Sequence, residues 1–420
     1  MKKDDRSIRL LERARQKYKS ETETEIELLI AREDYFPHLD YFLDLLKDGG
    51  DLGTIAQRVR KPTIALLCLQ APIELFWAQG FFPVKIYSGS YGASNLTSPR
   101  LPALMCPTLK AILGRAEMDE SLAEVPWVIP LTCDWVVKFK ETRELFGEFR
   151  RPVHFLEVPR VKDSPIARDR WFYEQYSLSG FLKKIGGEKL KAKNLLAALK
   201  VMEEARKALF QLTRLRRRGF IASVFYALIT SSFFLDNPTN WTANVLKVVE
   251  FLDKKEPKGL QEGIFLSGSP IFFPNFKALH LIEEAGLKVY GDDLCSSERI
   301  FPRHVGLTDT SEDGLMRALA EAYHRGCLCP VFAENSHRAS IIKEALSEAP
   351  IRGVIFHLLK GCHPYELDSF CLEESLKEWG LKYLKIETDY SIEDTGNLLT
   401  RLEAFRPTLA ESEPLDELAG

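Results

Sequence analysis

The sequence lacks several patterns that would assign a function at once. It has no Cys-x-x-Cys pair, so the signatures of a zinc ribbon and of a thioredoxin-type redox site are missing. It has no G-x-x-x-x-G-K-[S/T] loop, so we expect that the chain does not hydrolyse ATP itself. It also lacks an excess of one charge. The formal net charge of −3 gives no reason to expect nucleic acid or an anionic membrane as a partner.

Long apolar runs are missing as well. The longest extends from Phe220 to Leu235, and its sixteen residues include three serines and a threonine. A bilayer span needs roughly 20 apolar residues, so this run predicts a buried helix. The first residues are charged and lead into a charged helical pattern, which argues against a secretory signal. We therefore expect a soluble, cytoplasmic protein without a membrane partner.

Strand and helix patterns alternate along most of the 420-residue chain. They predict an α/β fold in which two doubly wound, Rossmann-like domains face a cleft. The expected strands cover residues 63–68, 82–87, 127–132 and 153–158 in the first half, and residues 263–266, 287–290, 354–358 and 383–386 in the second half.

These patterns divide the chain into four regions. Residues 1–60 predict a helical arm or outer layer that could pack on a partner subunit. Residues 61–253 predict the first α/β domain, whose last part (165–252) is a helical insertion between the two sheets. Residues 254–405 predict the second α/β domain, and residues 406–420 form an acidic tail.

Cysteine placement is the main clue to function. The stretch from Gly353 to Tyr365 reads as an apolar strand, then a turn with Cys362, then a helix opened by Pro364. Open α/β sheets bind ligands at the carboxyl ends of their strands. The partial positive charge of a helix N-terminus favours a thiolate. We therefore expect Cys362 to face the cleft.

Other cysteines share this kind of position. Four of them fall at or just past an expected strand end or at a helix start: Cys68, Cys106, Cys133 and Cys295. Cys327 and Cys329 lie in a loop after a helix. In a reducing cytoplasm these residues should be thiols or metal ligands, not disulfides. Thiolates from several loops around one cleft suit an iron–sulfur cluster. The same spacing is expected if these cysteines are simply small apolar residues packed where strands and helices meet. The pattern alone leaves both interpretations open.

Four other polar residues invite an interpretation. Cys371 lies on the body of a helix, so we expect a core residue and not a ligand. Asp134 and His363 each follow a candidate ligand and could tune a cluster or relay protons. For Asp134, a helix cap is the preferred reading. His357 lies within a strand and predicts a core histidine whose hydrogen bonds are satisfied.

Two further motifs have ordinary explanations. The arginines at positions 214, 216, 217 and 218 lie at an expected helix end, where we predict a solvated terminus and not a docking patch. The loop that starts Ser267-Gly-Ser-Pro joins a strand to a helix and could bind an anion, although it is no phosphate-binding loop.

Several passages together resemble a known family. They include Ala71-Pro-Ile-Glu-Leu75, Leu101-Pro-Ala-Leu-Met-Cys-Pro107, Thr132-Cys-Asp134, Gly268-Ser-Pro-Ile271, Gly353-Val-Ile355 followed by Cys362, and Glu387-Thr-Asp-Tyr-Ser391 leading to Thr400-Arg-Leu-Glu-Ala-Phe405. With these passages, residues 60–405 resemble the 2-hydroxyacyl-CoA dehydratase / benzoyl-CoA reductase family of iron–sulfur proteins.

The resemblance implies a cofactor and a partner. In that family three cysteines of a subunit hold a [4Fe–4S] cluster with one iron open to substrate, and they match Cys106, Cys133 and Cys362. A separate ATP-hydrolysing activator delivers a low-potential electron, which agrees with the missing phosphate-binding loop.

The additional cysteines resemble one branch of the family. In that branch, six cysteines hold two cubanes joined by a sulfide, an [8Fe–9S] double-cubane cluster. Cys68, Cys295 and Cys327 would hold the second cubane, and Cys329 is an equal alternative to Cys327. The branch implies an oxygen-sensitive homodimeric reductase of small molecules.

Three functions therefore follow as hypotheses. The leading one is a double-cubane iron–sulfur oxidoreductase that takes electrons from an ATP-driven activator and reduces a small molecule. The second is a 2-hydroxyacyl-CoA dehydratase or benzoyl-CoA reductase subunit with a single [4Fe–4S] cluster and a heteromeric partner. The third is a non-catalytic cluster carrier for electron transfer or cluster assembly. The sequence names neither the substrate nor a catalytic acid or base.

Overall fold

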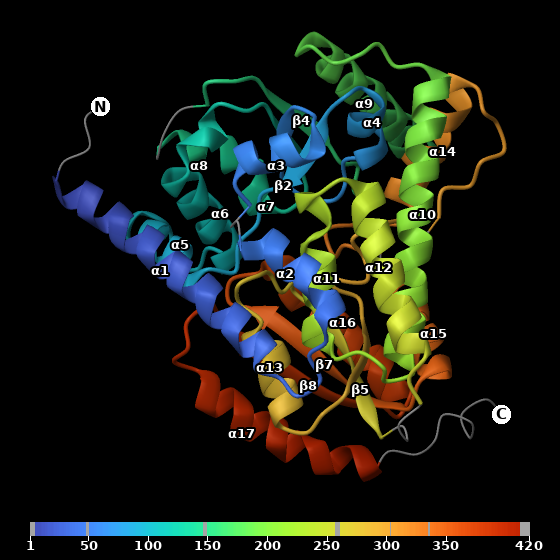
Figure 1. Ribbon diagram of the computed structural model, residues 1–420. Helices are drawn as coiled ribbons and strands as arrows, with labels where there is room; N and C mark the ends of the chain where they lie inside the picture. Colours follow the sequence, from blue (N-terminus) through green and yellow to red (C-terminus); the bar gives the residue numbers. More distant parts are fainter. Residues whose placement is uncertain are drawn as a thin grey trace.

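Two parallel four-stranded sheets form the centre of the protein (Figure 1). The computed structural model describes residues 5–47, 50–145, 149–256, 261–302, 304–334 and 337–411. The first sheet contains β1 (Thr63–Leu66), β2 (Phe82–Lys85), β3 (Trp127–Leu131) and β4 (Val153–Glu157). The second contains β5 (Gly263–Gly268), β6 (Val289–Asp292), β7 (Ile351–Leu359) and β8 (Lys382–Thr388). The predicted α/β fold with two Rossmann-like sheets is confirmed; β6 begins two residues later than expected, and β7 is longer at both ends.

The two sheets share one topology. Their strand orders are β2-β1-β3-β4 and β6-β5-β7-β8, and every pair is parallel. In each sheet the order in which strands are added reverses between the two central strands, which is the point where open α/β sheets bind ligands. These strands are β1 and β3 in one sheet and β5 and β7 in the other. Loops that follow them are therefore the first place to look for a site.

Helices cover both sheets. The first half contains α1 (Asp5–Ile30), α2 (Asp40–Lys47), α3 (Leu52–Val59), α4 (Ile73–Ala78), α5 (Tyr91–Thr97), α6 (Pro107–Met118), α7 (Asp134–Val137), α8 (Phe139–Glu144), α9 (Pro165–Lys184), α10 (Ala192–Arg217), α11 (Ser223–Ser231) and α12 (Pro238–Asp253). The second half contains α13 (Lys277–Glu284), α14 (Glu312–His324), α15 (His337–Glu348), α16 (His363–Glu378) and α17 (Thr395–Phe405).

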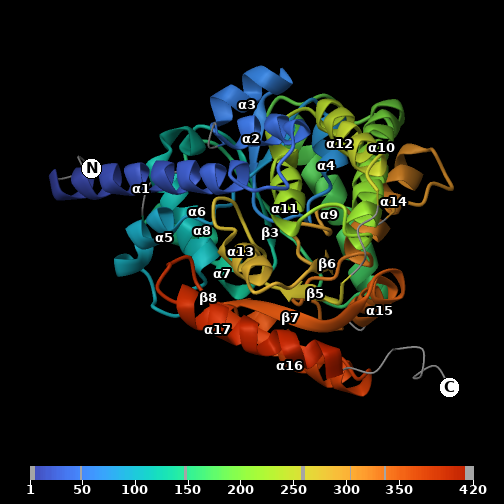
Figure 2. The ribbon, with the colours of Figure 1, turned by 60° about the horizontal axis from the view of Figure 1, so that its bottom comes forward.

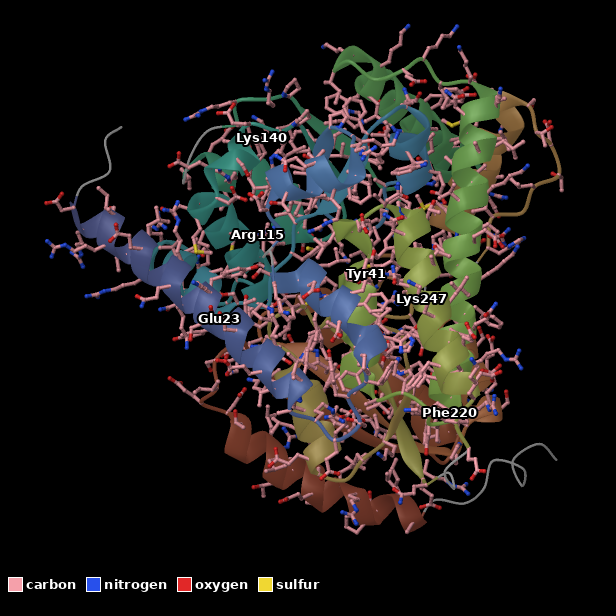
Figure 3. All side chains as sticks on the ribbon, in the orientation of Figure 1. Glu23, Tyr41, Arg115, Lys140, Phe220 and Lys247 are labelled. Carbon is pink, nitrogen blue, oxygen red and sulfur yellow. The ribbon has the colours of Figure 1, made fainter. Side chains whose placement is uncertain are left out.

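The N-terminal helix α1 lies across the outside of the molecule, over α5 and α6 (Figure 2). Its residues Leu11 and Ala14 are buried against Ala93 and Ala111 of those two helices. Glu23 of the same helix lies at the surface (Figure 3). The expected outer layer is present; its packing on a partner subunit and the four domain boundaries stay predictions.

The apolar run from Phe220 to Leu235 forms the buried helix α11 and a short turn at Phe233–Leu235. Tyr41 of α2 approaches this region, and its hydroxyl donates a hydrogen bond to Asp236 at 2.7 Å (Figure 3). Among the described residues, no helix is long and apolar enough to cross a bilayer. The run is thus a core element, as predicted.

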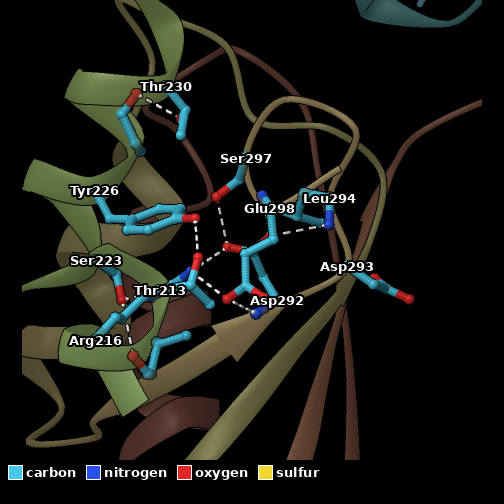
Figure 4. Close-up of polar contacts among 12 residues, drawn as sticks. Thr213, Arg216, Ser223, Tyr226, Thr230, Asp292, Asp293, Leu294, Ser297 and Glu298 are labelled. Carbon is cyan, nitrogen blue, oxygen red and sulfur yellow. Dashed lines mark hydrogen bonds and ion pairs between the residues drawn. The ribbon is translucent and has the colours of Figure 1, made fainter. Parts of the chain in front are cut away.

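The arginine-rich end of α10 corrects one prediction. Arg216 and Arg217 are buried, not solvated, whereas Arg218 is exposed and lies 3.7 Å from Asp253. Arg216 forms an ion pair with Asp292 at 2.5 Å (Figure 4). Arg217 pairs with Glu298 at 2.9 Å. The helix end abuts the end of β6, a contact between distant parts of the chain that the local sequence does not encode.

Two single-residue predictions have opposite outcomes. Cys371 is exposed on α16, so the expected core position is wrong: its side of the helix, with Leu367 and Phe370, faces outward. His357 is a buried core histidine, as expected, and its Nδ1 lies 2.8 Å from the carbonyl oxygen of Ser269. Burial lowers the pKa of His357 to about 4, so the ring is neutral at physiological pH.

Candidate functional site

Three of the predicted cysteines meet at the starts of three helices. Cys106, Cys133 and Cys362 are the N-cap residues of α6, α7 and α16, respectively. The thiols of Cys106 and Cys362 form a hydrogen bond, and the thiol of Cys133 acts electrostatically on that of Cys362. We call these residues the three-cysteine group. The structure therefore brings together residues from both halves of the chain.

Hydrogen bonds make one of these thiols acidic. The thiol of Cys362 donates to Cys106, and the backbone N–H groups of Thr108 and Leu109 lie at the start of α6, so the pKa of Cys106 falls to about 7. The same bond holds the proton on Cys362 and raises its pKa well above the ordinary value. Burial raises the pKa of Cys133. The group thus contains one thiol that readily becomes a thiolate ligand.

Close packing between two loops fixes this group. Gly361 has a φ of +73°, and a Cβ atom there would lie 2.0 Å from the carbonyl oxygen of Leu104. Only glycine allows the turn after β7 to approach the loop before α6 so closely. Tyr390 supports the same region, because its hydroxyl lies 2.8 Å from that of Thr108.

Replacing Gly361 with alanine should lower the free energy of unfolding by roughly 2–4 kcal/mol, because it combines a positive φ with a backbone clash. It should also weaken any metal binding at Cys106 and Cys362. Urea unfolding measures the first effect. Gly396 on α17 is the matched control, since a Cβ atom there meets nothing within 4 Å. A Gly361→Ala variant as stable as Gly396→Ala would contradict this role of the loop contact.

The other four predicted cysteines form a second group. Cys68 follows β1, Cys295 follows β6, and Cys327 and Cys329 follow α14. The thiol of Cys68 interacts electrostatically with those of Cys295 and Cys327, and Cys329 interacts with Cys327 and Cys68. All four line one cavity of about 270 Å³. We call them the four-cysteine group.

Backbone strain and burial mark this second group. Cys68 has a φ of +75°, a conformation that costs a non-glycine residue about 1–2 kcal/mol and that clusters at functional sites. Burial raises the pKa of Cys68 to about 12 and raises that of Cys327. Neutral thiols in this cavity would become thiolates only with a compensating cation. The amide of Gln70 donates to the sulfur of Cys327. Cys329 lines the same cavity, so the choice between Cys327 and Cys329 stays open.

Tyr87 lies between the two groups. Thiols of both act on its hydroxyl: Cys68, Cys295 and Cys329 from one group and Cys133 from the other. The guanidinium of Arg115, labelled in Figure 3, donates to the backbone carbonyl of Tyr87 at 3.1 Å. The two groups therefore adjoin one another across this side chain.

Cationic residues near the four-cysteine group were missed by the sequence reasoning. Lys85 ends β2, and its ammonium group lies 3.3 Å from the carbonyl oxygen of Cys295. The guanidinium of Arg299 interacts electrostatically with the thiols of Cys295 and Cys327. The only sequence signal was position: Lys85 closes a strand of the same sheet as Cys68, and Arg299 follows Cys295 by four residues.

The thiols fit a cluster better than a single metal ion. Within the described ranges, no three His, Cys, Asp or Glu side chains converge closely enough to hold one ion. A cluster distributes its thiolate ligands over several irons, so it accepts a wider spacing. The indole N–H of Trp135, two residues after Cys133, is buried and has no hydrogen-bond partner among the residues that the structure describes. Buried donors are normally satisfied, and a cluster sulfide would be a suitable acceptor.

Asp134 and His363 lie beside the three-cysteine group but do not enter it. The prediction that Asp134 caps a helix is wrong: Cys133 is the N-cap of α7, and the exposed carboxylate of Asp134 lies 3.8 Å from Arg160. The local reason is that the helix starts one residue earlier than the cap reading required. His363 is half exposed, and its Nδ1 lies 3.9 Å from Glu366.

The serines at the end of β5 and in the loop after it are hydrogen-bonded to residues from other segments of the chain. The hydroxyl of Ser267 lies 3.2 Å from the carboxylate of Asp293 and 2.7 Å from the guanidinium of Arg338. The hydroxyl of Ser269 accepts a hydrogen bond from the backbone N–H of Leu359. A side-chain hydrogen bond from Ser269 also favours the thiolate of Cys362, so anion binding at this loop stays a prediction.

A larger cavity of about 1100 Å³ opens between α1, α11, α13 and α17, and none of the thiols lines it. Tyr390 forms part of its wall and contacts Thr108 near the three-cysteine group on its other side. Size alone would make this cavity the default binding site. The reactive side chains lie instead around the smaller one.

The fold and the thiol groups define a parallel two-sheet α/β protein with a cysteine-rich site at its strand ends. The family model described as "2-hydroxyglutaryl-CoA dehydratase, D-component" matches residues 68–409. The chain therefore belongs to the 2-hydroxyglutaryl-CoA dehydratase D-component family, which confirms the resemblance noted in the sequence.

Curated relatives carry dehydratase names. The beta subunit of (R)-phenyllactyl-CoA dehydratase from Clostridium sporogenes is 24% identical, over 84% of this chain and 93% of that protein. The beta subunit of (R)-2-hydroxyglutaryl-CoA dehydratase from Acidaminococcus fermentans is 25% identical, over 83% of this chain and 93% of its own length. YjiM of Escherichia coli strain K12, provisionally named a dehydratase subunit, is 26% identical over 82% of this chain and 90% of that protein.

Proposed function

We propose that this chain is an iron–sulfur oxidoreductase that holds a double-cubane-type cluster and reduces a small molecule. One observation carries the proposal: a second group of four thiols lines its own cavity, beside the three-cysteine group. Packing alone does not explain seven thiols in two adjoining groups, because four of them line an open cavity and not a filled core.

The residues divide naturally between two sets of ligands. Cys106, Cys133 and Cys362 would hold one cubane, and its remaining iron would be left without a protein ligand. Cys68, Cys295 and either Cys327 or Cys329 would hold the other. When bound, such a cluster would accept and release single electrons at low potential.

Backbone and side-chain groups of the protein would favour thiolates or a cluster at these positions. Backbone N–H groups of Thr108 and Leu109 stabilise the thiolate of Cys106. Trp135 offers an unpartnered indole N–H beside Cys133. The buried hydroxyl of Tyr87 lies within electrostatic reach of thiols from both groups. None of these residues is placed as a catalytic acid or base.

The electron source in this proposal is a separate protein. The chain lacks a phosphate-binding loop, and its family works with a separate activator component. We propose an ATP-hydrolysing activator as that partner and a homodimer as the working form. A cluster with an open iron would also make the enzyme oxygen-sensitive.

A second function has its own support. The names of the relatives favour a 2-hydroxyacyl-CoA dehydratase subunit with a single [4Fe–4S] cluster at the three-cysteine group. In that case Cys68, Cys295 and Cys327 would be packing residues, and an acyl-CoA would perturb the cluster spectrum. A reductase of another small molecule would show no such response.

Replacing Cys295 with alanine tests the choice. The double-cubane proposal predicts that Cys295→Ala loses about half of its iron and most of its reductase activity, since the second cubane loses a ligand. Iron and acid-labile sulfide are measured after anaerobic purification. Cys371→Ala is the control, because Cys371 is exposed on α16 and belongs to neither group. If Cys295→Ala keeps the iron content and the activity of the unmodified protein, the double-cubane proposal is wrong.

A further inference from the structure

Lys85 occupies an unusual position for a lysine. Its ammonium group lies 4.4 Å from the centre of the Tyr87 ring, 5.1 Å from that of Phe272 and 6.0 Å from that of Phe234. It also donates a hydrogen bond to the backbone carbonyl of Cys295, at 3.3 Å. Aromatic faces and a carbonyl dipole hold a cation in place, but they do not neutralise it.

No carboxylate balances this charge in the described part of the chain: no ion pair involves Lys85. The ionisable groups that act on it are the thiols of Cys295 and Cys68 and the guanidinium of Arg299. Withdrawing an unpaired ammonium group from water is costly. A nearby anion would remove that cost, and the groups acting on Lys85 that could supply one are the two thiols.

Arg299 is a second cation near the four-cysteine group, and it lines the cavity of that group. Its guanidinium donates to the backbone carbonyl of Asp293 and, at 3.0 Å, to the hydroxyl of Tyr365. The carboxylate of Asp293 also acts on Arg299, but that carboxylate is already paired with Arg338. The thiols of Cys295 and Cys327 act on Arg299 as well.

The two cysteine groups thus differ in how they receive positive charge. Around Cys106 the donors are backbone N–H groups at a helix start, each with a partial charge. Around Cys68 and Cys295 they are full side-chain cations. A full charge at short range in a poorly solvated site has the larger effect on an anion.

We propose that Lys85 and Arg299 are positioning residues of the four-cysteine group, which balance the negative charge of its thiolates and of the cluster that they would hold. This inference rests on the proposed function. It implies that a cluster at this group is reduced more easily than it would be without the two cations, because positive charge stabilises the reduced, more negative form.

Two substitutions at Lys85 separate charge from packing. Lys85→Met keeps an unbranched chain against the aromatic rings but removes the charge. Lys85→Arg keeps the charge. Lys61→Met is the matched control: Lys61 also lies over an aromatic ring, that of Trp77 at 4.7 Å, and it precedes β1, at the opposite end of that strand from Cys68.

The measurement is iron per chain together with a redox titration followed by electron paramagnetic resonance, on full-length protein purified without oxygen. We expect Lys85→Met to lose iron from the four-cysteine group or to shift its signal to a lower midpoint potential, with Lys85→Arg and Lys61→Met close to the unmodified protein. Arg299→Met should act in the same direction.

The outcomes separate this inference from the function on which it rests. Unchanged iron and an unchanged midpoint potential in both Lys85→Met and Arg299→Met would overturn the role of the cations and leave the cluster proposal intact. An unmodified protein with about four irons, and none lost in Cys68→Ala, would overturn both. If Lys85→Met and Lys85→Arg lose iron equally, Lys85 acts through packing and the inference is wrong.

Discussion

Replacing Cys106 with alanine is expected to abolish activator-dependent reduction of the protein. Cys106 is the thiol with the lowest pKa of its group, it starts α6, and it is hydrogen-bonded to Cys362. Its loss should weaken iron binding at the three-cysteine group more than about 100-fold. Replacing a residue that only hydrogen-bonds to a metal ligand already costs roughly 10- to 100-fold in metal affinity.

The measurement is the absorbance or paramagnetic signal that appears when the activator and ATP are added to the anaerobic protein. Cys371→Ala serves again as the control with a cysteine removed elsewhere. If Cys106→Ala has the iron content of the unmodified protein and takes up electrons at the same rate, the three-cysteine group does not hold the cluster.

Replacing Asp292 with alanine is expected to lower the free energy of unfolding by about 1.5–3 kcal/mol, because it removes the nearer of the two carboxylates that pair with the buried Arg216, while Glu298 remains. Asp292 pairs with Arg216 at 2.5 Å, and both side chains are buried (Figure 4). Its carboxylate also accepts hydrogen bonds from the hydroxyl of Ser297 and the backbone N–H of Leu294. The variant should therefore loosen the loop that carries Cys295 as well.

Urea unfolding of the metal-free protein gives this difference directly. Asp253→Ala is a matched control, because Asp253 faces Arg218 across 3.7 Å on the exposed side of the same helix end. Exposed pairs of this kind contribute about 0–1 kcal/mol. Equal stability of the two variants would show that the buried network does not anchor the end of α10 to β6.

The strands could be predicted because their signal is local. β1 is a short apolar run followed by a Pro-containing helix start, and β7 is a longer run that contains Gly353 and ends shortly before Gly361. Such runs specify a buried parallel strand wherever the sheet places it. Helix α5 was missed because its seven residues include Gly92 and Ser94, which give little helical pattern.

The candidate site could be predicted only in part. Each cysteine was found from its place at a strand end or helix start. The division into a group around Cys106 and a group around Cys68 followed from family resemblance, and contacts between distant segments now support it. Lys85 was missed because nothing local distinguishes it from a surface lysine at a strand end. The same limit explains Arg216, whose partner Asp292 lies in the other half of the chain.

The most direct test of the double-cubane proposal is the content of iron and acid-labile sulfide per chain after strictly anaerobic purification. The proposal predicts about eight irons and about nine acid-labile sulfides per chain, the content of one [8Fe–9S] cluster. About four irons would contradict it and leave a single-cluster dehydratase subunit, with Cys68, Cys295 and Cys327 as packing residues. No iron after reconstitution would contradict any cluster at either cysteine group.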